Sequence, residues 1–165
     1  MKVTIALLLL SSTFAVAQDS QAGHEGRCSN ATLKGNYGST ISGTKPTGAP
    51  PAPIESFIGL AIANYDGRGN FTQTYGTHHA SITGDSTTDT GFGTYEINPD
   101  CSGTATLTLT GRATPVFLKF WFIVVDGGDQ INLVVMTPTP NGNPVPAWNL
   151  TTGVGRRIKD TDNRF

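Results

Sequence analysis

The stretch Val116–Asp126, VFLKFWFIVVD, is the most apolar run after the first 17 residues, and it decides the fold class. It is rich in Val, Ile, Phe and Trp, which favour β-strands, and with Lys119 in its middle it is too short to cross a membrane as a helix. Gly127 and Gly128 follow it, and then a second apolar run, Gln130–Met136. Two glycines can supply the positive φ values of a tight turn, so the two runs are predicted to form a β-hairpin.

Alternation along a strand gives the first run two faces with different compositions. The wholly apolar face, predicted to point inward, carries Val116, Leu118, Phe120, Phe122 and Val124. The other face is unusually apolar for a surface in contact with water, and it carries Phe117, Lys119, Trp121, Ile123 and Val125. Because exposed apolar patches mark interaction sites, we expect a homo-oligomer or a docked partner on the outer face of strand 116–126.

The remaining sequence is rich in Gly, Thr and Pro and has no long window of helical periodicity. This pattern is typical of short strands joined by turns. We predict strands at residues 33–42, 57–66, 71–79, 91–97, 104–111, 116–126, 130–136 and 147–158. The predicted fold is all-β, an eight-stranded antiparallel up-and-down β-barrel, and a two-sheet β-sandwich is the alternative.

The connections between these strands divide into long and short ones, which predicts two different ends of the barrel. Three are long and polar or proline-rich: Gly43–Glu55, His79–Thr90 and Thr137–Pro146. In an up-and-down barrel the odd connections share one end, so these three are expected to form an open mouth opposite a closed end of tight turns. Cys28 and Cys101 both fall at the predicted closed end, and we expect them to form a disulfide.

The first residues, MKVTIALLLLSSTFAVAQ, resemble a secretory signal peptide with cleavage after Ala17. The expected location is therefore secreted or periplasmic, with no membrane span after cleavage. Residues 1–17 are the expected signal peptide, 18–32 an N-terminal extension with Cys28, 33–158 the barrel and 159–165 a polar tail. The formal net charge is −1 and 14% of residues are charged, so without a basic stripe a nucleic-acid partner is not expected.

Two short segments resemble the lipocalin pattern, in which Gly-x-Trp opens the first strand and a basic residue of the last strand packs over it. They are Gly35-Asn36-Tyr37, with tyrosine in place of tryptophan, and Gly155-Arg156-Arg157. The layout with DGRGN, NPDCSGTATLTL and VVDGGDQI also resembles uncharacterised secreted bacterial proteins with a lipocalin-like or allene-oxide-cyclase-like (calycin-type) barrel. The resemblance implies either a small apolar ligand cavity or, as in the cyclases, a pocket that folds a reactive intermediate.

Alternating strand direction predicts which side chains lie near the mouth, and these are the candidate ligand-binding residues. The set is mostly apolar with one titratable group, and Tyr75 is placed on the same face as His79, one layer deeper. The candidates are Phe57, Tyr75, His79, Phe92, Leu118, Met136 and Trp148.

No motif in the chain names a reaction. His78 and His79 are adjacent and point to opposite faces of a regular strand, so no metal site is predicted, and no cofactor is expected either. Three functions remain open: binding of a small hydrophobic molecule, an isomerase or cyclase using the same cavity, and a surface interaction protein with a filled barrel. Binding is the main prediction, and the sequence leaves catalysis, ligand identity and oligomeric state undecided.

Overall fold

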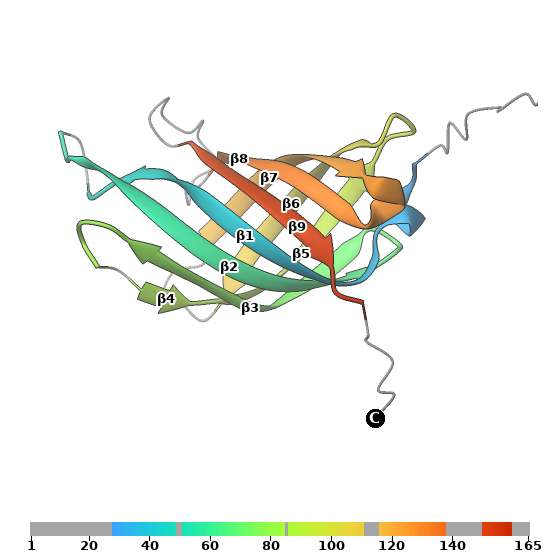
Figure 1. Cartoon of the computed structure of the whole chain (residues 1–165), viewed down its shortest axis with the longest axis horizontal. Helices are drawn as coiled ribbons and strands as arrows, with labels where there is room; N and C mark the ends of the chain where they lie inside the picture. The colour runs from blue at the N-terminus through green and yellow to red at the C-terminus, as the bar shows by residue number, and fades with distance from the viewer. Residues whose placement is uncertain (1–27, 49–50, 85, 111–115, 138–149, 160–165) are drawn as a thin grey trace, which may run out of the picture.

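The computed structural model describes residues 28–48, 51–84, 86–110, 116–137 and 150–159. Nearly all of these residues lie in antiparallel strands (Figure 1). The strands are β1 (Lys34–Pro46), β2 (Ile54–Asp66), β3 (Asn70–Ala80), β4 (Ser86–Thr88), β5 (Thr90–Ile97), β6 (Ser102–Thr110), β7 (Val116–Val125), β8 (Gln130–Thr137) and β9 (Thr151–Arg157). Two 3-10 turns complete them, η1 (Asn30–Thr32) and η2 (Asp126–Gly128), and no helix in the described part of the chain could span a membrane.

The sheet is closed, which confirms the predicted barrel over the sandwich. Its strand order is β2-β1-β9-β8-β7-β6-β5-β3-β4, and a further pairing of β2 with β3 closes the ring. The ring itself has eight strands, and the short β4 is a ninth strand attached to it. It pairs with β3 from Thr77 to His79, where β5 has ended its own pairing with the same strand at Gln73. β4 and β5 thus run along one edge of β3 in succession, separated by Asp89.

Two predicted loops are shorter than expected. The loop predicted at Gly43–Glu55 is partly strand, because the β1–β2 ladder continues to the pair of Pro46 with Ile54. Proline is accepted there because it is the last residue of the strand, where its missing N–H costs no inner ladder bond. The loop predicted at His79–Thr90 likewise contains β4.

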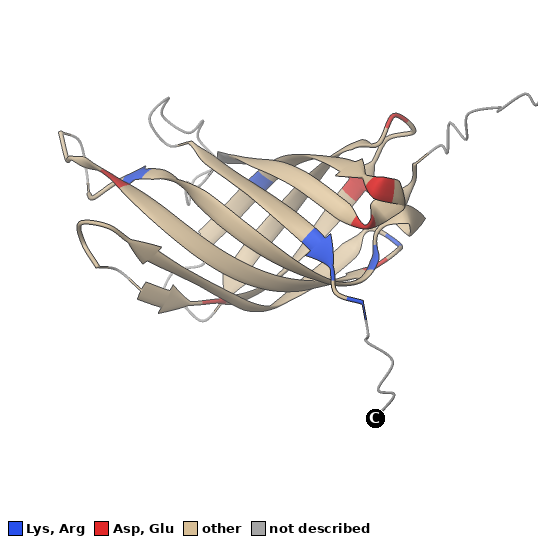
Figure 2. Cartoon of the chain, in the orientation of Figure 1, with Lys and Arg blue, Asp and Glu red and all other residues tan. Residues whose placement is uncertain are grey.

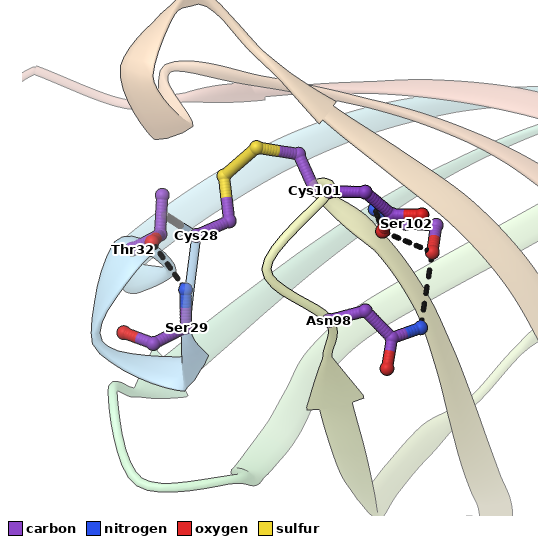
Figure 3. The surroundings of a disulfide bond; sticks show 7 residues. Cys28, Ser29, Thr32, Asn98, Cys101 and Ser102 are labelled. Atoms are coloured by element: carbon purple, nitrogen blue, oxygen red, sulfur yellow. Dashed lines mark hydrogen bonds between the residues drawn. A yellow bond between two sulfur atoms is a disulfide. The ribbon is translucent and has the colours of Figure 1, made fainter. Parts of the chain in front are cut away.

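Tight turns gather at one end of the barrel, as predicted (Figure 1). At this closed end lie the turns β2–β3, β5–β6 and β7–β8, together with the disulfide between Cys28 and Cys101, whose Cα atoms are 5.0 Å apart. Figure 3 shows the disulfide joining the segment before η1 to the β5–β6 turn. Within that turn Ser102 accepts a hydrogen bond from the Asn98 amide at 3.0 Å, so the bridge joins two locally ordered segments.

Aromatic side chains fill the barrel interior next to the closed end. The Tyr65 ring stacks on Phe71 at 5.1 Å and meets Tyr37 and Tyr95 edge-on at 5.2 and 5.3 Å. The Tyr95 hydroxyl donates to the Leu33 carbonyl at 2.9 Å, and Tyr37 donates to the Gly128 carbonyl. Burial raises the pKa of Tyr65 and of Tyr37, because a phenolate there would lose its hydration.

Inward-facing glycines make room for these large side chains. A Cβ at Gly93 would lie 2.5 Å from the Phe71 ring, and one at Gly103 would lie 2.4 Å from the Phe122 ring. Alternation of small and large residues is how a small barrel fills its interior. At this end the filling is complete.

Arg157 of β9 lies over the Tyr37 ring, with its guanidinium carbon 5.5 Å from the ring centre. Its Nη2 donates to the carbonyls of Thr32 and Gly128, both at 3.2 Å. Its Nε is 3.3 Å from Asp129 Oδ1 without hydrogen-bond geometry, so that contact is electrostatic only. A basic residue of the last strand therefore packs over the aromatic residue of the first strand.

Charged residues of the described chain lie mostly at the two ends of the barrel (Figure 2). Lys119 is an exception, because it is exposed in the middle of β7 and pairs with Thr106 of β6. The long outer faces of the strands are therefore built mainly from neutral residues, with hydroxyls on β5 and β6 and apolar side chains on β2 and β7.

Candidate ligand cavity

A cavity of about 420 Å³ lies inside the barrel in the half nearer the mouth. It is bounded by inward-facing side chains of most strands. Its apolar wall is formed mainly by β6, β7 and β8, and comprises Leu107, Leu109, Val116, Leu118, Phe120 and Val135. Its polar side is formed by β3 and the residue between β4 and β5, and comprises Gln73, His78 and Asp89.

The cavity exists because small residues replace large ones on the inner face of β2 and β3. Ala61 pairs across the strands with Gly76, and Gly59 pairs with His78. Two residues further toward the closed end, Ala63 packs in the buried cluster that contains Phe71 and Tyr95. Without a large side chain at Ala61, that part of the lumen stays unfilled, whereas the space beside Gly76 is taken by the Gln73 side chain.

The polar side contains a chain of hydrogen bonds. His78 Nδ1 lies 3.0 Å from the Thr87 hydroxyl, and this hydroxyl donates to Asp89 Oδ2 at 3.3 Å. Asp89 is 5% exposed, and its carbonyl accepts a hydrogen bond from the Gln73 amide at 3.5 Å. The His78 and Phe57 rings meet in a T-shaped arrangement with their centres 6.2 Å apart, so the imidazole lies between an aromatic residue and a hydroxyl.

A β-bulge in β3 decides which histidine faces the cavity. Ile62 pairs with Tyr75 and Ala63 pairs with Gln73, so Thr74 is an extra residue without a partner. One extra residue exchanges the two faces of a strand beyond it. His78 therefore points inward, whereas His79 is exposed.

The predicted inward orientation of Tyr75 and His79 is thus wrong, and the bulge is the physical reason. Tyr75 is 42% exposed on the outer surface. The expectation assumed regular alternation from Phe71 onward, which would have made residues 73, 75, 77 and 79 inward-facing. The structure keeps Phe71 and Gln73 inside and then turns Gly76, His78 and Ala80 inward instead.

The other predicted site residues divide between the cavity wall, the outer surface and undescribed parts of the chain. Phe57 and Leu118 line the cavity. Phe92 is 57% exposed and points outward, because Gly91 and Gly93 take the inward positions of β5. Met136 lies at an irregular step of the β7–β8 ladder, and its side chain is outside the described part, as is the whole of Trp148.

Sequence reasoning missed Gln73, His78 and Asp89. Asp89 lies in the segment predicted to be a polar loop, where an aspartate carries no signal of burial. The doublet His78-His79 was a usable signal, since one member of an adjacent pair must face inward in any strand.

Glu55 is a second buried carboxylate, at the mouth end of β2. Its side chain is 1% exposed and accepts hydrogen bonds from the backbone N–H groups of Ile82 and Thr83, at 3.0 and 2.9 Å. Lys45 lies 3.7 Å away. The Thr83 N–H bond is the main reason that the pKa of Glu55 is below its usual value. Glu55 therefore fixes the segment after β3 to the rim of the mouth.

A larger depression of about 1260 Å³ lies on the outer surface. Outward residues at one level of seven strands line it, including Leu60 of β2, Trp121 of β7 and Val154 of β9. Leu60 is 54% exposed and Trp121 is 53% exposed, so this is an open band on the wall and not an enclosed site. The predicted outward face of strand 116–126 is confirmed, with Phe117 and Ile123 also about half exposed.

No protein-family model and no curated protein matches the chain. Among solved structures, the crystal structure of Rv2717c from M. tuberculosis is similar, with 15% sequence identity and a TM-score of 0.39. The match covers 78% of this chain and 94% of that one.

Among the described residues, no group of three or more His, Cys, Asp or Glu side chains is arranged to hold a metal ion.

Proposed function

We propose that the protein binds a small, mainly apolar molecule inside the barrel. The observation that carries this proposal is the cavity of about 420 Å³. Ligand sites typically enclose about 300–1,000 Å³ and combine apolar walls with a few polar groups. Leu118 and Phe120 on one side and His78 with Asp89 on the other provide this combination.

The position of the cavity also supports binding over a purely structural role. A barrel that only had to be stable would gain by filling its lumen, because each unfilled methylene-sized space costs packing energy. This barrel is filled at the closed end and left open nearer the mouth. The difference is made at Ala61, whose small side chain borders the cavity.

Titration with N-phenyl-1-naphthylamine, a neutral dye that fluoresces in apolar surroundings, tests the proposal. We expect saturable binding with one site per chain. Ala61→Phe should weaken binding at least tenfold, because its ring would occupy the cavity. The matched control is Thr106→Phe, which adds the same ring on the outer face of β6 and should leave binding unchanged. Equal binding by the parent and Ala61→Phe would place the dye elsewhere and refute the proposal.

An isomerase or cyclase acting in the same cavity is the second candidate function. The titratable His78 in the cavity wall favours it, since imidazole is the commonest acid–base group at neutral pH. Conversion of a bound ligand, followed by chromatography, separates it from simple binding. A product that also forms with His78→Leu would exclude an acid–base role for this residue.

The outer face of β7 supports a separate proposal, self-association. Phe117, Trp121 and Ile123 are each about half exposed there. We expect light scattering to give more than one chain per particle, and Trp121→Lys to give monomers. Thr72→Lys is the control, because Thr72 is exposed on β3, which is not a neighbour of β7 in the barrel, and this variant should leave the particle size unchanged. A monomeric parent protein would remove this proposal without affecting the cavity.

A further inference from the structure

The barrel has two apolar outer faces, and they lie on opposite sides of its wall. The β7 face comprises the exposed side chains of Phe117, Trp121, Ile123 and the adjoining Val134 of β8. The β2 face comprises the exposed side chains of Ile54, Ile58, Leu60 and Ile62. Around the closed ring β2-β1-β9-β8-β7-β6-β5-β3, β7 is four strands from β2 in either direction. The two faces therefore point away from each other.

The two faces together supply enough apolar area for a stable interface. Their side chains are about half exposed, which leaves roughly 400 Å² of apolar surface on each face. A contact between one face of each of two copies would bury about 800 Å², and standard interfaces bury about 1,200–2,000 Å², of which a little more than half is non-polar. Hydroxyl groups of the neighbouring strands, as at Thr40 of β1 and Thr104 of β6, provide the polar rim.

Lys119 determines which faces can meet. It is exposed in the middle of the β7 face, between Phe117 and Trp121, and its cross-strand partners are Thr106 and Thr137. A two-fold contact brings the same patch of both copies together. Two β7 faces would therefore place Lys119 of one copy against the patch that carries Lys119 of the other, and the like charges oppose this contact.

The β2 face carries no charge of this kind. From Ile54 to Ile62 its outward residues are Ile, Ser, Ile, Leu and Ile. Ser42 of β1 and Thr77 of β3 border it, and their hydroxyl oxygens can accept hydrogen bonds from a lysine ammonium group. A β7 face on a β2 face therefore buries the same apolar area without opposing charges.

We propose that copies of this chain associate head to tail, with the β7 face of one copy on the β2 face of the next. This inference rests on the self-association proposed above for β7, and it names the surface that β7 contacts. A pair formed in this way keeps one free face of each kind, so further copies add at both ends and the assembly grows into a row. Because the contact uses the wall of the barrel, the mouth of each copy stays open to ligand.

Two variants that each block one face test this arrangement. Trp121→Lys places a charge in the β7 face and Leu60→Lys places one in the β2 face, and both side chains are more than half exposed, so the barrel should fold in both variants. In sedimentation velocity, parent particles should grow with protein concentration, and each variant alone should be monomeric, with association at least tenfold weaker. An equimolar mixture of the two variants should form dimers and nothing larger, because each mixed pair has one intact face of each kind.

Thr72→Lys is again the control. Thr72 is exposed on β3 and pairs with Asn64, which is about 13 Å along β2 from Leu60, so its charge lies outside the β2 face and particle growth should be unchanged.

The outcomes separate this inference from the proposals above. Parent particles that stop at two chains, or a Leu60→Lys variant that associates like the parent, would overturn the head-to-tail contact and leave self-association through β7 standing. A mixture of the two variants that stays monomeric would also overturn it. A monomeric parent protein would refute both the head-to-tail contact and self-association, and dye binding in the cavity would be unaffected.

Discussion

The two halves of the barrel interior differ in the size and packing of their inward side chains. Near the closed end, Tyr65, Phe71 and Tyr95 stack on one another, and inward glycines admit their rings without leaving space. Nearer the mouth, small residues face small residues, and polar side chains enter the wall. One fold thus provides stability at one end and an accessible volume at the other. The contrast shows that the size of inward residues along β2 and β3, and not the strand topology, decides whether a barrel of this kind is hollow.

Removal of the disulfide should have the largest effect, and it acts at the closed end. Cys28 and Cys101 are 73 positions apart in the chain. Closing a loop of that length restricts the unfolded chain, so the double variant Cys28→Ser, Cys101→Ser should lose roughly 4 kcal/mol of unfolding free energy. Denaturant titration of the variant and the oxidised parent protein measures this loss. An unchanged midpoint would mean that the closed end does not depend on the bridge.

Truncation of one phenylalanine in each half compares their packing directly. Phe71 is 6% exposed within the aromatic cluster, and Phe71→Ala should cost about 3–5 kcal/mol. Phe57 borders the cavity and is only partly buried, so Phe57→Ala should cost about 1–2 kcal/mol. Both losses are read from the same denaturant experiment. Equal losses of unfolding free energy in the two variants would contradict the conclusion that the closed end is filled and the half nearer the mouth is hollow.

Enlargement of two neighbouring alanines sharpens the comparison within one strand. Ala61 and Ala63 are both buried on the inner face of β2, but only Ala61 borders the cavity. Ala63→Leu should destabilise by about 1–3 kcal/mol through overpacking, whereas Ala61→Leu should stay within about 1 kcal/mol of the parent protein. Thermal unfolding monitored by circular dichroism distinguishes the two. A larger loss for Ala61→Leu than for Ala63→Leu would show that the space near Ala61 cannot accept a side chain.

Acid should weaken carboxylate hydrogen bonds at both ends of the barrel, with the smallest effect on stability. At the closed end the pKa of Asp66 falls to about 2, because the Asn70 amide and nearby backbone N–H groups donate to it. A carboxyl group with a lowered pKa contributes stability above its unfolded value, and this contribution is lost as pH falls from about 4 to about 2. Glu55 starts from a higher ordinary value, 4.5 against 3.8, and its pKa is also lowered.

Each end should therefore respond to acid through its own carboxylate, Glu55 at the mouth and Asp66 at the closed end. Amide chemical shifts followed during an acid titration report the two responses through Ile82 and Thr83 at the mouth, and through Arg68 and Asn70 at the closed-end turn. Glu55→Gln should remove the response of Ile82 and Thr83 and leave that of Arg68 and Asn70. An acid response of Ile82 and Thr83 that persists in Glu55→Gln would contradict the assignment.

The sequence predicted the closed end better than the mouth, for a physical reason. At the closed end, the tight turns and the cysteine pair carry strong local signals, and their positions agree with the structure. Nearer the mouth, β3 reads Thr74-Tyr75-Gly76-Thr77-His78-His79, with no contrast between its two faces. The bulge at Thr74 is set by pairing with β2, which no local pattern encodes. The inward position of Asp89 depends in turn on β4 and β5 sharing one partner strand.

The unpaired Thr74 has one more consequence, for the register of this wall. If the bulge were absent and Thr74 paired with Ile62, regular alternation would reverse the faces of the half of β3 nearer the mouth. His79 would then point inward and His78 outward. Because the two histidines are adjacent in the chain, an imidazole would line the lumen in either pairing register of the strand. The doublet thus makes the presence of a histidine in the wall independent of the register, while its partners Thr87 and Asp89 remain specific to one.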